Sequence, residues 1–217
     1  MVLSIGRCGH NCTRYGIMKP MDDEQASIAS DMTIQYLRVI LESDIDVVSR
    51  TIYLIADIDN NSAETVIKGL DFLSSISEEE PITIKLTTYG GDPYMGFAIH
   101  DAIRRCKCPI ITMMTGACMS AGVLIASAGD KGKRYADVNC QWMYHAGGEG
   151  FDGEVNNFIA TAEHVKDFKN TCIDAITQRT KKPRKFWKAM EDSASDTYFK
   201  TEDAKKYGII DRITEAF

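Results

Sequence analysis

Apolar and polar positions along the chain follow two alternating periods. Residues 50–56, 82–88 and 109–115 are runs rich in β-branched and apolar side chains, as the strands of a buried sheet are. Residues 65–73 and 95–105 carry apolar side chains three and four positions apart, which predicts amphipathic helices between those strands. Strands and helices at this cadence form βαβ units, so the pattern predicts an α/β fold with a mostly parallel sheet.

The alternation continues through the second half of the chain in shorter pieces. The small residues 120–128 predict a helix, and residues 133–136 and 141–144 are brief β-like runs. A glycine-rich segment then leads into a long helix that ends near Thr180. Ser62 is the expected N-cap of the first of the amphipathic helices.

The start of the chain differs from the rest because it shows neither period. Its first residues are rich in Gly, Cys, Ser and Asp, which predicts an arm over residues 1–31, flexible or lining a pore. One domain is expected over residues 32–217, and it begins with a helical spacing over residues 32–41. The start lacks the apolar run of a signal peptide, and no stretch approaches the roughly 18 consecutive apolar residues of a membrane helix.

The balance of charges argues against one class of partner. The 217 residues include 25 Lys and Arg against 31 Asp and Glu, a formal net charge of −6, whereas nucleic-acid-binding proteins normally carry a basic surface. Neither nucleic acid nor a membrane is therefore an expected partner. Seven cysteines are an odd number for a disulfide framework, which predicts free thiols and a cytoplasmic location.

Two motifs that suggest bound cofactors fall short of what those cofactors need. Cys8, His10 and Cys12 lie close together, but a structural zinc site needs four ligands and no second Cys/His cluster is nearby in the sequence. Residues 129–134 are rich in Gly and Lys, but they lack the G-x-x-x-x-G-K-[ST] spacing of a phosphate-binding loop. The sequence thus predicts no metal, no cofactor and no ATP hydrolysis by the chain itself.

Ser120 lies where a strand gives way to a helix, within the small-residue segment 116–122. A serine on such a tight turn exposes its hydroxyl, and the backbone N–H groups at the helix start are placed to hold an oxyanion. The same position suits an ordinary N-cap or a small packing residue, which on this pattern alone is the simpler interpretation. Cys118, two residues earlier, is expected to be a small buried side chain.

A nucleophilic serine needs a base, and His145 is the histidine in the most suitable place. It ends the β-like run over residues 141–144, and catalytic side chains gather at the strand ends of α/β sheets. His10 lies in the arm, while His100 and His164 lie in helices beside polar neighbours and are expected at the surface. On position alone, His145 is equally compatible with a partly buried loop residue.

Position in the sequence does not decide two further parts of a hydrolytic site, the carboxylate that orients the histidine and the second oxyanion donor. With 31 acidic residues, composition does not select the carboxylate that would orient the histidine. Gly90 and Gly91 follow a strand and allow close backbone approach to a substrate, which suits a second oxyanion donor. An ordinary turn between strand and helix is the simpler account of the glycine pair.

Five segments, in this order, resemble those of the proteolytic subunit of the Clp ATP-dependent proteases. The resemblance runs from about Arg50 to Ile213. The segments are Tyr89-Gly-Gly-Asp92, Gly116-Ala-Cys-Met-Ser-Ala-Gly122, Ala128-Gly-Asp-Lys-Gly-Lys-Arg-Tyr-Ala136, Met143-Tyr-His145 and Tyr198-Phe-Lys-Thr-Glu-Asp-Ala-Lys-Lys-Tyr-Gly-Ile-Ile-Asp211. Their order along most of the chain makes the match highly specific.

The resemblance implies a catalytic triad in which Ser120 is the nucleophile, His145 the general base and Asp196 the residue that orients His145. Asp196 is selected because the family's aspartate lies just before the aromatic pair that opens the closing segment. The resemblance also implies that the backbone N–H groups of Gly91 and Ala121 form the oxyanion hole. These two oxyanion donors agree with the glycine turn and the helix start that the residues themselves suggest.

The resemblance further implies a fold and an assembly. The fold is the ClpP/crotonase-like α/β fold of repeated ββα units, extended by a handle of a strand and a long helix over about residues 146–182. Members of the family are serine endopeptidases that hydrolyse unfolded proteins inside a homo-oligomeric chamber of two stacked heptameric rings. An AAA+ unfoldase of the Clp type would be the partner that uses ATP.

Three other hypotheses share this fold. A non-catalytic ring subunit would typically have lost a member of the triad, and this chain keeps all three residues. A crotonase-like acyl-CoA enzyme would have the oxyanion glycines without Ser120 and His145. A virus capsid-maturation protease has a similar serine motif, so it is the alternative that is hardest to separate from a Clp-type endopeptidase.

Overall fold

The computed structural model describes residue 31 and residues 44–145, 155–193 and 195–214. The chain divides into two compact units, Met1–Val39 and Ile40–Phe217, and the account below concerns the second. The predicted arm and the predicted helix over residues 32–41 lie outside the described residues apart from Asp31, as do residues 146–154 of the handle. These features and the domain boundary at residue 32 stay predictions.

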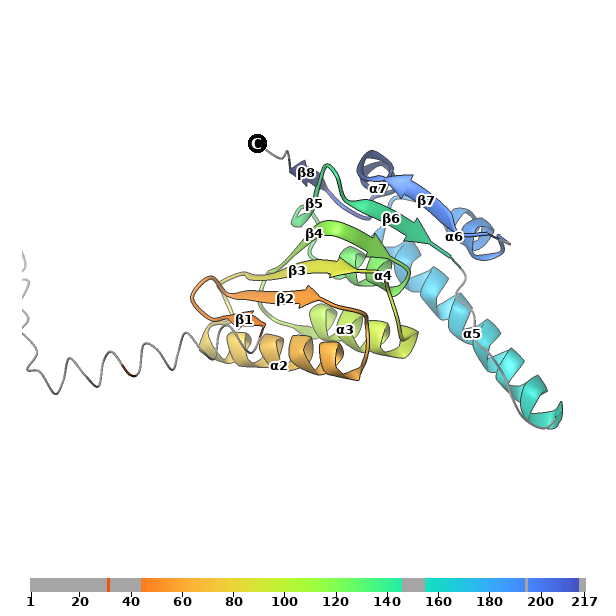
Figure 1. Ribbon diagram of the computed structural model, residues 1–217, viewed down its shortest axis with the longest axis horizontal. Helices are drawn as coiled ribbons and strands as arrows, with labels where there is room; N and C mark the ends of the chain where they lie inside the picture. Colours follow the sequence, from red (N-terminus) through yellow and green to blue (C-terminus); the bar gives the residue numbers. More distant parts are fainter. Residues whose placement is uncertain (1–30, 32–43, 146–154, 194, 215–217) are drawn as a thin grey trace, which may run out of the picture. The chain divides into compact units, whose positions relative to one another are not determined.

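The described strands form one sheet, most of which is parallel (Figure 1). They are β1 Ile45–Asp46, β2 Thr51–Ile55, β3 Ile82–Thr88, β4 Ile110–Met119, β5 Arg134–Asp137, β6 Gln141–Tyr144, β7 Thr197–Lys200 and β8 Arg212–Thr214. The main path runs β1-β2-β3-β4-β5-β8, and β6 pairs with β4 and with β7. The β1–β2 and β6–β7 pairs are antiparallel and the other pairs are parallel. The predicted α/β fold with a mostly parallel sheet is confirmed.

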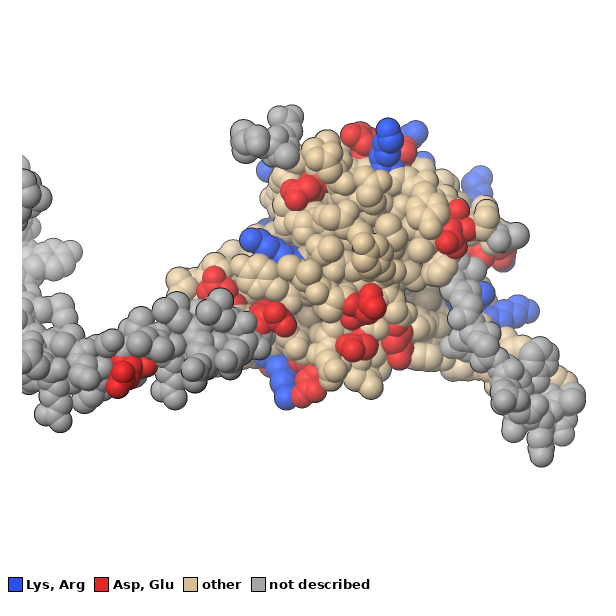
Figure 2. Space-filling view, in the orientation of Figure 1, with Lys and Arg blue, Asp and Glu red and all other residues tan. Residues whose placement is uncertain are grey.

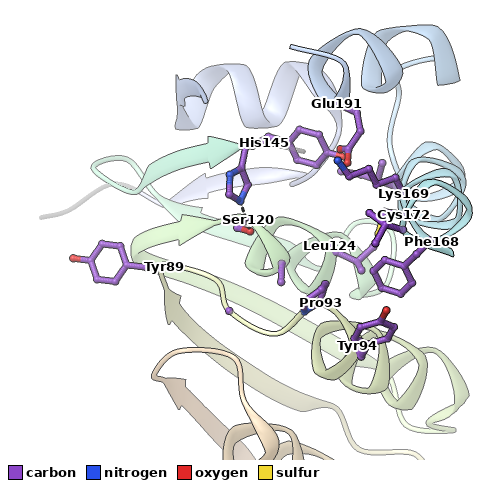
Figure 3. Close-up of a pocket in the computed structure, with 15 residues that line it drawn as sticks. Tyr89, Pro93, Tyr94, Ser120, Leu124, His145, Phe168, Lys169, Cys172 and Glu191 are labelled. Atoms are coloured by element: carbon purple, nitrogen blue, oxygen red, sulfur yellow. Dashed lines mark hydrogen bonds between the residues drawn. The ribbon is translucent and has the colours of Figure 1, made fainter. Parts of the chain in front are cut away.

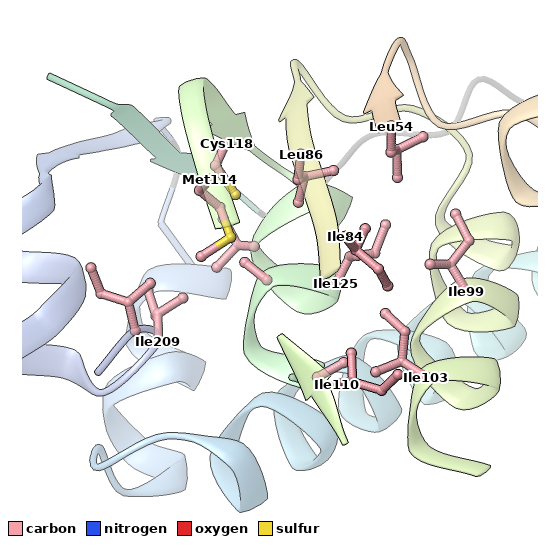
Figure 4. Close-up of a cluster of buried hydrophobic side chains, with 14 of the residues drawn as sticks. Leu54, Ile84, Leu86, Ile99, Ile103, Ile110, Met114, Cys118, Ile125 and Ile209 are labelled. Atoms are coloured by element: carbon pink, nitrogen blue, oxygen red, sulfur yellow. The ribbon is translucent and has the colours of Figure 1, made fainter. Parts of the chain in front are cut away.

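Helices cover the face of this sheet that carries the apolar side chains. The described helices are α2 Asn60–Ile76, α3 Pro93–Arg105, α4 Ala121–Ala128, α5 Val155–Arg179, α6 Arg184–Glu191 and α7 Thr201–Tyr207. Along β3 the buried Ile84 and Leu86 alternate with the exposed Lys85, the period of a strand with one covered face. Figure 4 shows Ile84 and Leu86 of β3 with Ile99 and Ile125 of the helices, and all four belong to the hydrophobic core.

Polar caps determine where α2 and α3 begin. The Asp59 carboxylate accepts a hydrogen bond from the Ser62 N–H at 2.8 Å, and the Ser62 hydroxyl accepts one from the Asp59 N–H at 2.9 Å. The N-cap of α2 is therefore Asp59, and Ser62 is its partner in a capping box rather than the predicted cap. At α3, the Asp92 carboxylate accepts from the Tyr94 N–H at 2.8 Å, and Pro93 is the first helical residue.

Strand β4 is longer than its pattern predicts, and its added residues pair with β6. The sequence predicts a strand over residues 109–115 that a glycine ends, but β4 continues through Gly116 to Met119. Gly116 has a φ of 60°, a left-handed conformation that glycine adopts without strain. Before it β4 pairs with β5, and after it β4 pairs with β6. Because β4 and β6 run parallel, their carboxyl ends meet at one edge of the sheet.

His100 corrects another expectation, because it is buried in α3 rather than exposed. Its side chain lies on the face that also carries Gly96, Ile99 and Ile103, and only 7% of the residue is exposed. Its Nδ1 atom lies 2.9 Å from the Asp101 carboxylate, while Nε2 has no hydrogen-bond partner among the described residues. Polar neighbours in the sequence suggested a surface position, but the three- and four-residue spacing places His100 on the apolar stripe.

On the face of the molecule that Figure 2 shows, charged side chains are spread rather than gathered. On the face in Figure 2, Lys and Arg lie mainly toward the edges, and Asp and Glu lie among broad uncharged areas. No helix of the described residues is long and apolar enough to cross a membrane.

Candidate active site

Three segments that are far apart in the sequence end at the same edge of the sheet. Ser120 follows β4 directly, and His145 follows β6, the parallel neighbour of β4. Asp196 precedes β7, which runs antiparallel to β6 with Tyr144 opposite Thr197. One step beyond that register pair, residue 196 lies opposite residue 145. The strand pairing therefore brings the three side chains together without any contribution from flexible loops.

The side chains of Ser120, His145 and Asp196 form a continuous chain of polar contacts, of which Figure 3 shows the pair Ser120 and His145. The Ser120 Oγ atom lies 2.8 Å from Nε2 of His145, and His145 Nδ1 lies 3.3 Å from the Asp196 carboxylate. A carboxylate beside Nδ1 favours the tautomer whose proton is on Nδ1, which leaves Nε2 free to accept the proton of the serine hydroxyl. The three residues that the resemblance selects are thus within reach of one another in the order that a general-base mechanism needs.

The backbone of Ser120 holds its hydroxyl toward His145 rather than toward the helix. Ser120 has a φ of 53° and a ψ of −123°, a conformation that is costly for a residue with a Cβ atom. It occupies the N-cap position of α4, yet its side chain makes no capping hydrogen bond. The interpretation of Ser120 as an ordinary N-cap therefore fails, and its strained backbone resembles that of nucleophiles on strand-to-helix turns.

The turn at Gly90 and Gly91 passes directly beside Ser120. Hydrogen bonds of 2.7 Å from the Ile58 N–H to the Gly90 carbonyl and from the Asp92 N–H to the Ile58 carbonyl anchor this turn. The two glycines have φ values of 103° and 141°, and a Cβ atom on Gly90 would lie 2.5 Å from the Ser120 Cβ. Only glycine fits so close an approach.

Two backbone N–H groups near the serine hydroxyl are free of hydrogen bonds to any described residue. They are those of Gly91, on the glycine turn, and Ala121, the first residue of α4. The Ser120 N–H is not a candidate because it donates to the Met143 carbonyl at 2.9 Å. Free N–H groups beside a nucleophile are what an oxyanion requires.

A cavity of about 370 Å³ opens beside Ser120 and His145. Helices α3, α4 and α5 supply most of its wall, which is chiefly apolar and includes Tyr94, Leu124, Val165, Phe168 and Ile176. Figure 3 shows polar side chains at one end of it, where Glu191 and Lys169 lie. A pocket of this size and composition accommodates one large side chain of a substrate.

Comparisons with known proteins give the family of the chain. The model of the family described as Clp protease matches residues 41–217. The ATP-dependent Clp protease proteolytic subunit of Deinococcus radiodurans is 32% identical over 166 residues, which cover 76% of this chain and 80% of that protein. A mutant of ClpP1 from Listeria monocytogenes has a similar structure, with a TM-score of 0.71 and 28% identity over 78% of this chain and 94% of that one.

The chain belongs to the Clp protease family. The family match and the structural similarity confirm the ClpP-type fold that the motifs imply, and they identify the chain as a Clp-type serine peptidase. They favour neither the capsid-maturation protease nor the non-catalytic ring subunit.

Other candidate residues of this Clp-family chain lie away from the triad position. Asp192, four residues before Asp196, pairs with the Lys188 ammonium at 2.8 Å. His164 is exposed, as expected, and its Nε2 lies 2.9 Å from the Tyr94 hydroxyl. His10 lies outside the described residues. In the described part of the chain, no three His, Cys, Asp or Glu side chains are grouped as a metal ion requires.

Cys118 is buried, which confirms the expectation from its place in the sequence. None of the residue is exposed, and burial raises the pKa of its thiol well above the ordinary value. A thiol with so high a pKa stays protonated near neutral pH, and only the thiolate is a strong nucleophile. Cys118 therefore does not compete with Ser120 as a nucleophile.

Sequence reasoning missed the polar end of the pocket of this Clp peptidase. Burial raises the pKa of the Glu191 carboxyl, although a hydrogen bond from the Tyr144 hydroxyl and the charge of Lys169 act in the opposite direction. Burial also raises the pKa of the Cys172 thiol, to about 12, and the Glu191 carboxylate adds to that effect. One signal was available in the sequence. Glu191 lies four residues after Trp187 on the same helix, and Trp187 is fully buried.

Proposed function

We propose that this Clp-type serine peptidase cleaves unfolded polypeptides with Ser120, His145 and Asp196 as its catalytic triad. The observation that carries the proposal is the continuous contact from the Ser120 hydroxyl through both ring nitrogens of His145 to the Asp196 carboxylate. A serine is a weak nucleophile unless an adjacent base takes its proton, and that base needs a third group to fix its tautomer. In this chain the base is His145, whose Nε2 lies 2.8 Å from Ser120 Oγ, and the third group is Asp196, whose carboxylate lies 3.3 Å from His145 Nδ1.

In the first half of the reaction, Ser120 Oγ attacks the carbonyl carbon of the peptide bond while its proton moves to His145 Nε2. The carbonyl oxygen of the substrate becomes an oxyanion, which the N–H groups of Gly91 and Ala121 stabilise. The tetrahedral intermediate then collapses, the C–N bond breaks, and His145 gives its proton to the leaving amine. The product of this half is an ester between Ser120 and the amino-terminal part of the substrate.

In the second half, water takes the place of the amine. His145 removes a proton from the water, whose oxygen attacks the ester carbonyl, and the same two N–H groups hold the second oxyanion. When the C–O bond to Ser120 breaks, the proton on His145 returns to Ser120 Oγ and the carboxylic acid leaves. Asp196 keeps the imidazole in one orientation throughout and stabilises its charged form.

We further propose that the chain works inside an oligomeric chamber. The relative from Deinococcus radiodurans is named as the proteolytic subunit of an ATP-dependent protease, which supports an oligomeric assembly that works with a separate Clp-type ATPase. Because this chain has no phosphate-binding-loop motif, the ATPase would be another protein. The proposed assembly is two stacked heptameric rings in the cytoplasm, with the arm over residues 1–31 at the pore and the handle over residues 146–182 between the rings.

Peptidase assays of the purified chain, combined with light scattering, test this proposal. A species far heavier than the 24.2 kDa monomer should cleave short peptides and leave a folded protein intact, whether or not ATP is present. Addition of a Clp-type ATPase that binds the chain should make digestion of the folded protein depend on ATP. Digestion of a folded substrate by the chain and ATP alone would contradict the need for a partner, and a persistent monomer would contradict the chamber.

A further inference from the structure

Glu191 is a buried carboxylate at the end of the pocket beside the triad. It is the last residue of α6, and 8% of it is exposed. It lines the same cavity as Ser120 and His145, and Figure 3 shows its carboxylate directed into that cavity. Among the described residues it forms no ion pair within 4.0 Å, in contrast to the neighbouring Asp192. The proposed triad makes no use of it.

The surroundings of Glu191 offer only partial compensation for its burial. The Tyr144 hydroxyl and the positive charge of Lys169 on α5 favour its ionised form and so oppose the effect of burial on its pKa. Lys169 lines the pocket and is partly buried, and Figure 3 shows its side chain at the same end of the pocket as Glu191. A buried carboxylate without a close ionic partner is costly for a protein to maintain, and such groups are frequent in binding sites.

The rest of the pocket is complementary to a long aliphatic chain. Leu124, Phe168 and Ile176 supply apolar parts of the wall of the cavity that Ser120 and Glu191 also line. Lysine and arginine combine an apolar stem with a charged tip, and they bind where the stem contacts apolar side chains and the tip reaches a carboxylate. A purely aliphatic side chain would fill the same wall but would leave the buried Glu191 carboxylate without its partner.

We propose that this pocket binds the side chain of the residue on the amino side of the cleaved bond and that Glu191 selects lysine or arginine there. The proposal rests on the proposed function, because it assumes that Ser120 attacks the carbonyl of that residue. Lys169 then has the role of an internal competitor: in the free enzyme its ammonium partly neutralises Glu191, and a substrate cation must displace it. Removal of the two charges should therefore change selectivity in opposite directions.

Two peptides that differ only by one ammonium group measure this selectivity. Both carry the same sequence and fluorogenic leaving group, with lysine in one and norleucine in the other on the amino side of the cleaved bond. Norleucine keeps the aliphatic stem and lacks the ammonium. The quantity compared is the ratio of kcat/KM for the lysine peptide to kcat/KM for the norleucine peptide, so that general losses of activity cancel.

In the wild type we expect this ratio to exceed about 10, as a buried ion pair requires. Glu191→Gln should lower the ratio about 10-fold or more, and Lys169→Met should raise it. Asp192→Asn is the matched control, because it removes the adjacent carboxylate, which is exposed and paired with Lys188, and should leave the ratio unchanged. If Glu191→Gln does not fold, the wild-type ratio and the Lys169→Met variant decide the matter.

A wild-type ratio near or below 1, or a ratio that Glu191→Gln and Lys169→Met leave unchanged, would overturn the assignment of Glu191. These results would leave the proposed function intact, because cleavage of either peptide that disappears in Ser120→Ala supports the triad. Failure of the wild type to cleave both peptides would instead contradict the proposed function and, with it, this inference.

Discussion

His145 and His100 lie in two regions of the molecule that differ in how far they expose a histidine and in which polar partners they give it. His145 lies at the carboxyl end of β6, where 31% of its side chain is exposed and both ring nitrogens face polar partners, Ser120 and Asp196. His100 lies in the middle of α3, 7% exposed, with one nitrogen beside Asp101 and the other without a partner among the described residues. Reactivity requires access as well as partners, and only His145 has both.

The difference follows from the elements that carry the two histidines. The residue after a strand of a parallel sheet lies at the edge where ligands bind, and His145 is that residue for β6. The register of β6 with β7 adds the Asp196 carboxylate opposite it. A helix face presents its residue to the core, where polar groups lose their water. Burial accordingly lowers the pKa of His100, with Arg179 and Arg104 adding to the effect and Asp101 opposing it. Position in the fold thus separates the proposed general base, His145, from a histidine that is buried in the core, His100.

Replacing the carboxylate partner of His145 should have the largest effect. Asp196→Asn keeps the shape of the site but no longer favours the proton on Nδ1, so kcat for peptide cleavage should fall by about 10⁴. Asp192→Asn and Asp203→Asn, which alter carboxylates that make no recorded contact with His145, should stay within a few-fold of the wild type. Peptide assays on the assembled oligomer measure all three. Full activity of Asp196→Asn would show that His145 is oriented by something else.

A pair of glycine variants tests the backbone beside the triad, and the fall in kcat that we expect is smaller than for Asp196→Asn. An alanine Cβ at Gly91 would lie 2.3 Å from the Ile58 carbonyl oxygen, so Gly91→Ala should displace the turn and its free N–H. Loss of one oxyanion donor typically lowers kcat by about 10²–10³.

Gly132 is the matched control for Gly91 because it also has a positive φ, 87°, with nothing within 4 Å of a Cβ atom. Gly132→Ala should cost about 1–2 kcal/mol of unfolding free energy and leave kcat nearly unchanged. Urea unfolding and peptide assays measure the two quantities. Equal activities of the two variants would remove Gly91 from the account.

His100 should show the smallest of these effects, in stability rather than activity. Its pKa in the folded state lies below the ordinary value of 6.5, so the unfolded chain takes up the proton more readily. The unfolding free energy should therefore fall as the pH drops through 6.5 toward the folded-state pKa, and stay constant above that range. His100→Leu should reduce this dependence when urea unfolding is followed between about pH 7.5 and 5. If His100→Leu has the same pH dependence of unfolding free energy as the wild type, the pKa of His100 does not differ between the folded and unfolded states.

The parts of the fold that sequence predicts well are those in which local pattern and tertiary contact agree. Strands β3 and β6 have the predicted bounds, because alternation and strand ends are local properties. The continuation of β4 through Gly116 depends on its change of partner from β5 to β6, which no local pattern encodes.

The same distinction applies to the candidate site. Ser120 and His145 lie at strand ends that the pattern locates, whereas selection of Asp196 needed the family resemblance, since the β6–β7 register is a long-range contact. Glu191 lay among charged residues at the end of a short helix, and its burial arises from α6 packing beside α5 and Tyr144. Helical spacing from Trp187 was the available signal for Glu191, as spacing from Ile103 was for His100.

Covalent labelling of the serine tests the central claim most directly. An activated serine reacts with fluorophosphonates, whereas ordinary serines are inert. Mass spectrometry of the labelled wild-type oligomer should find one adduct, on Ser120, and Ser120→Ala should take up none. An adduct on Cys118 or on another serine, or no adduct in the assembled protein, would contradict the claim that Ser120 is the nucleophile held by His145 and Asp196.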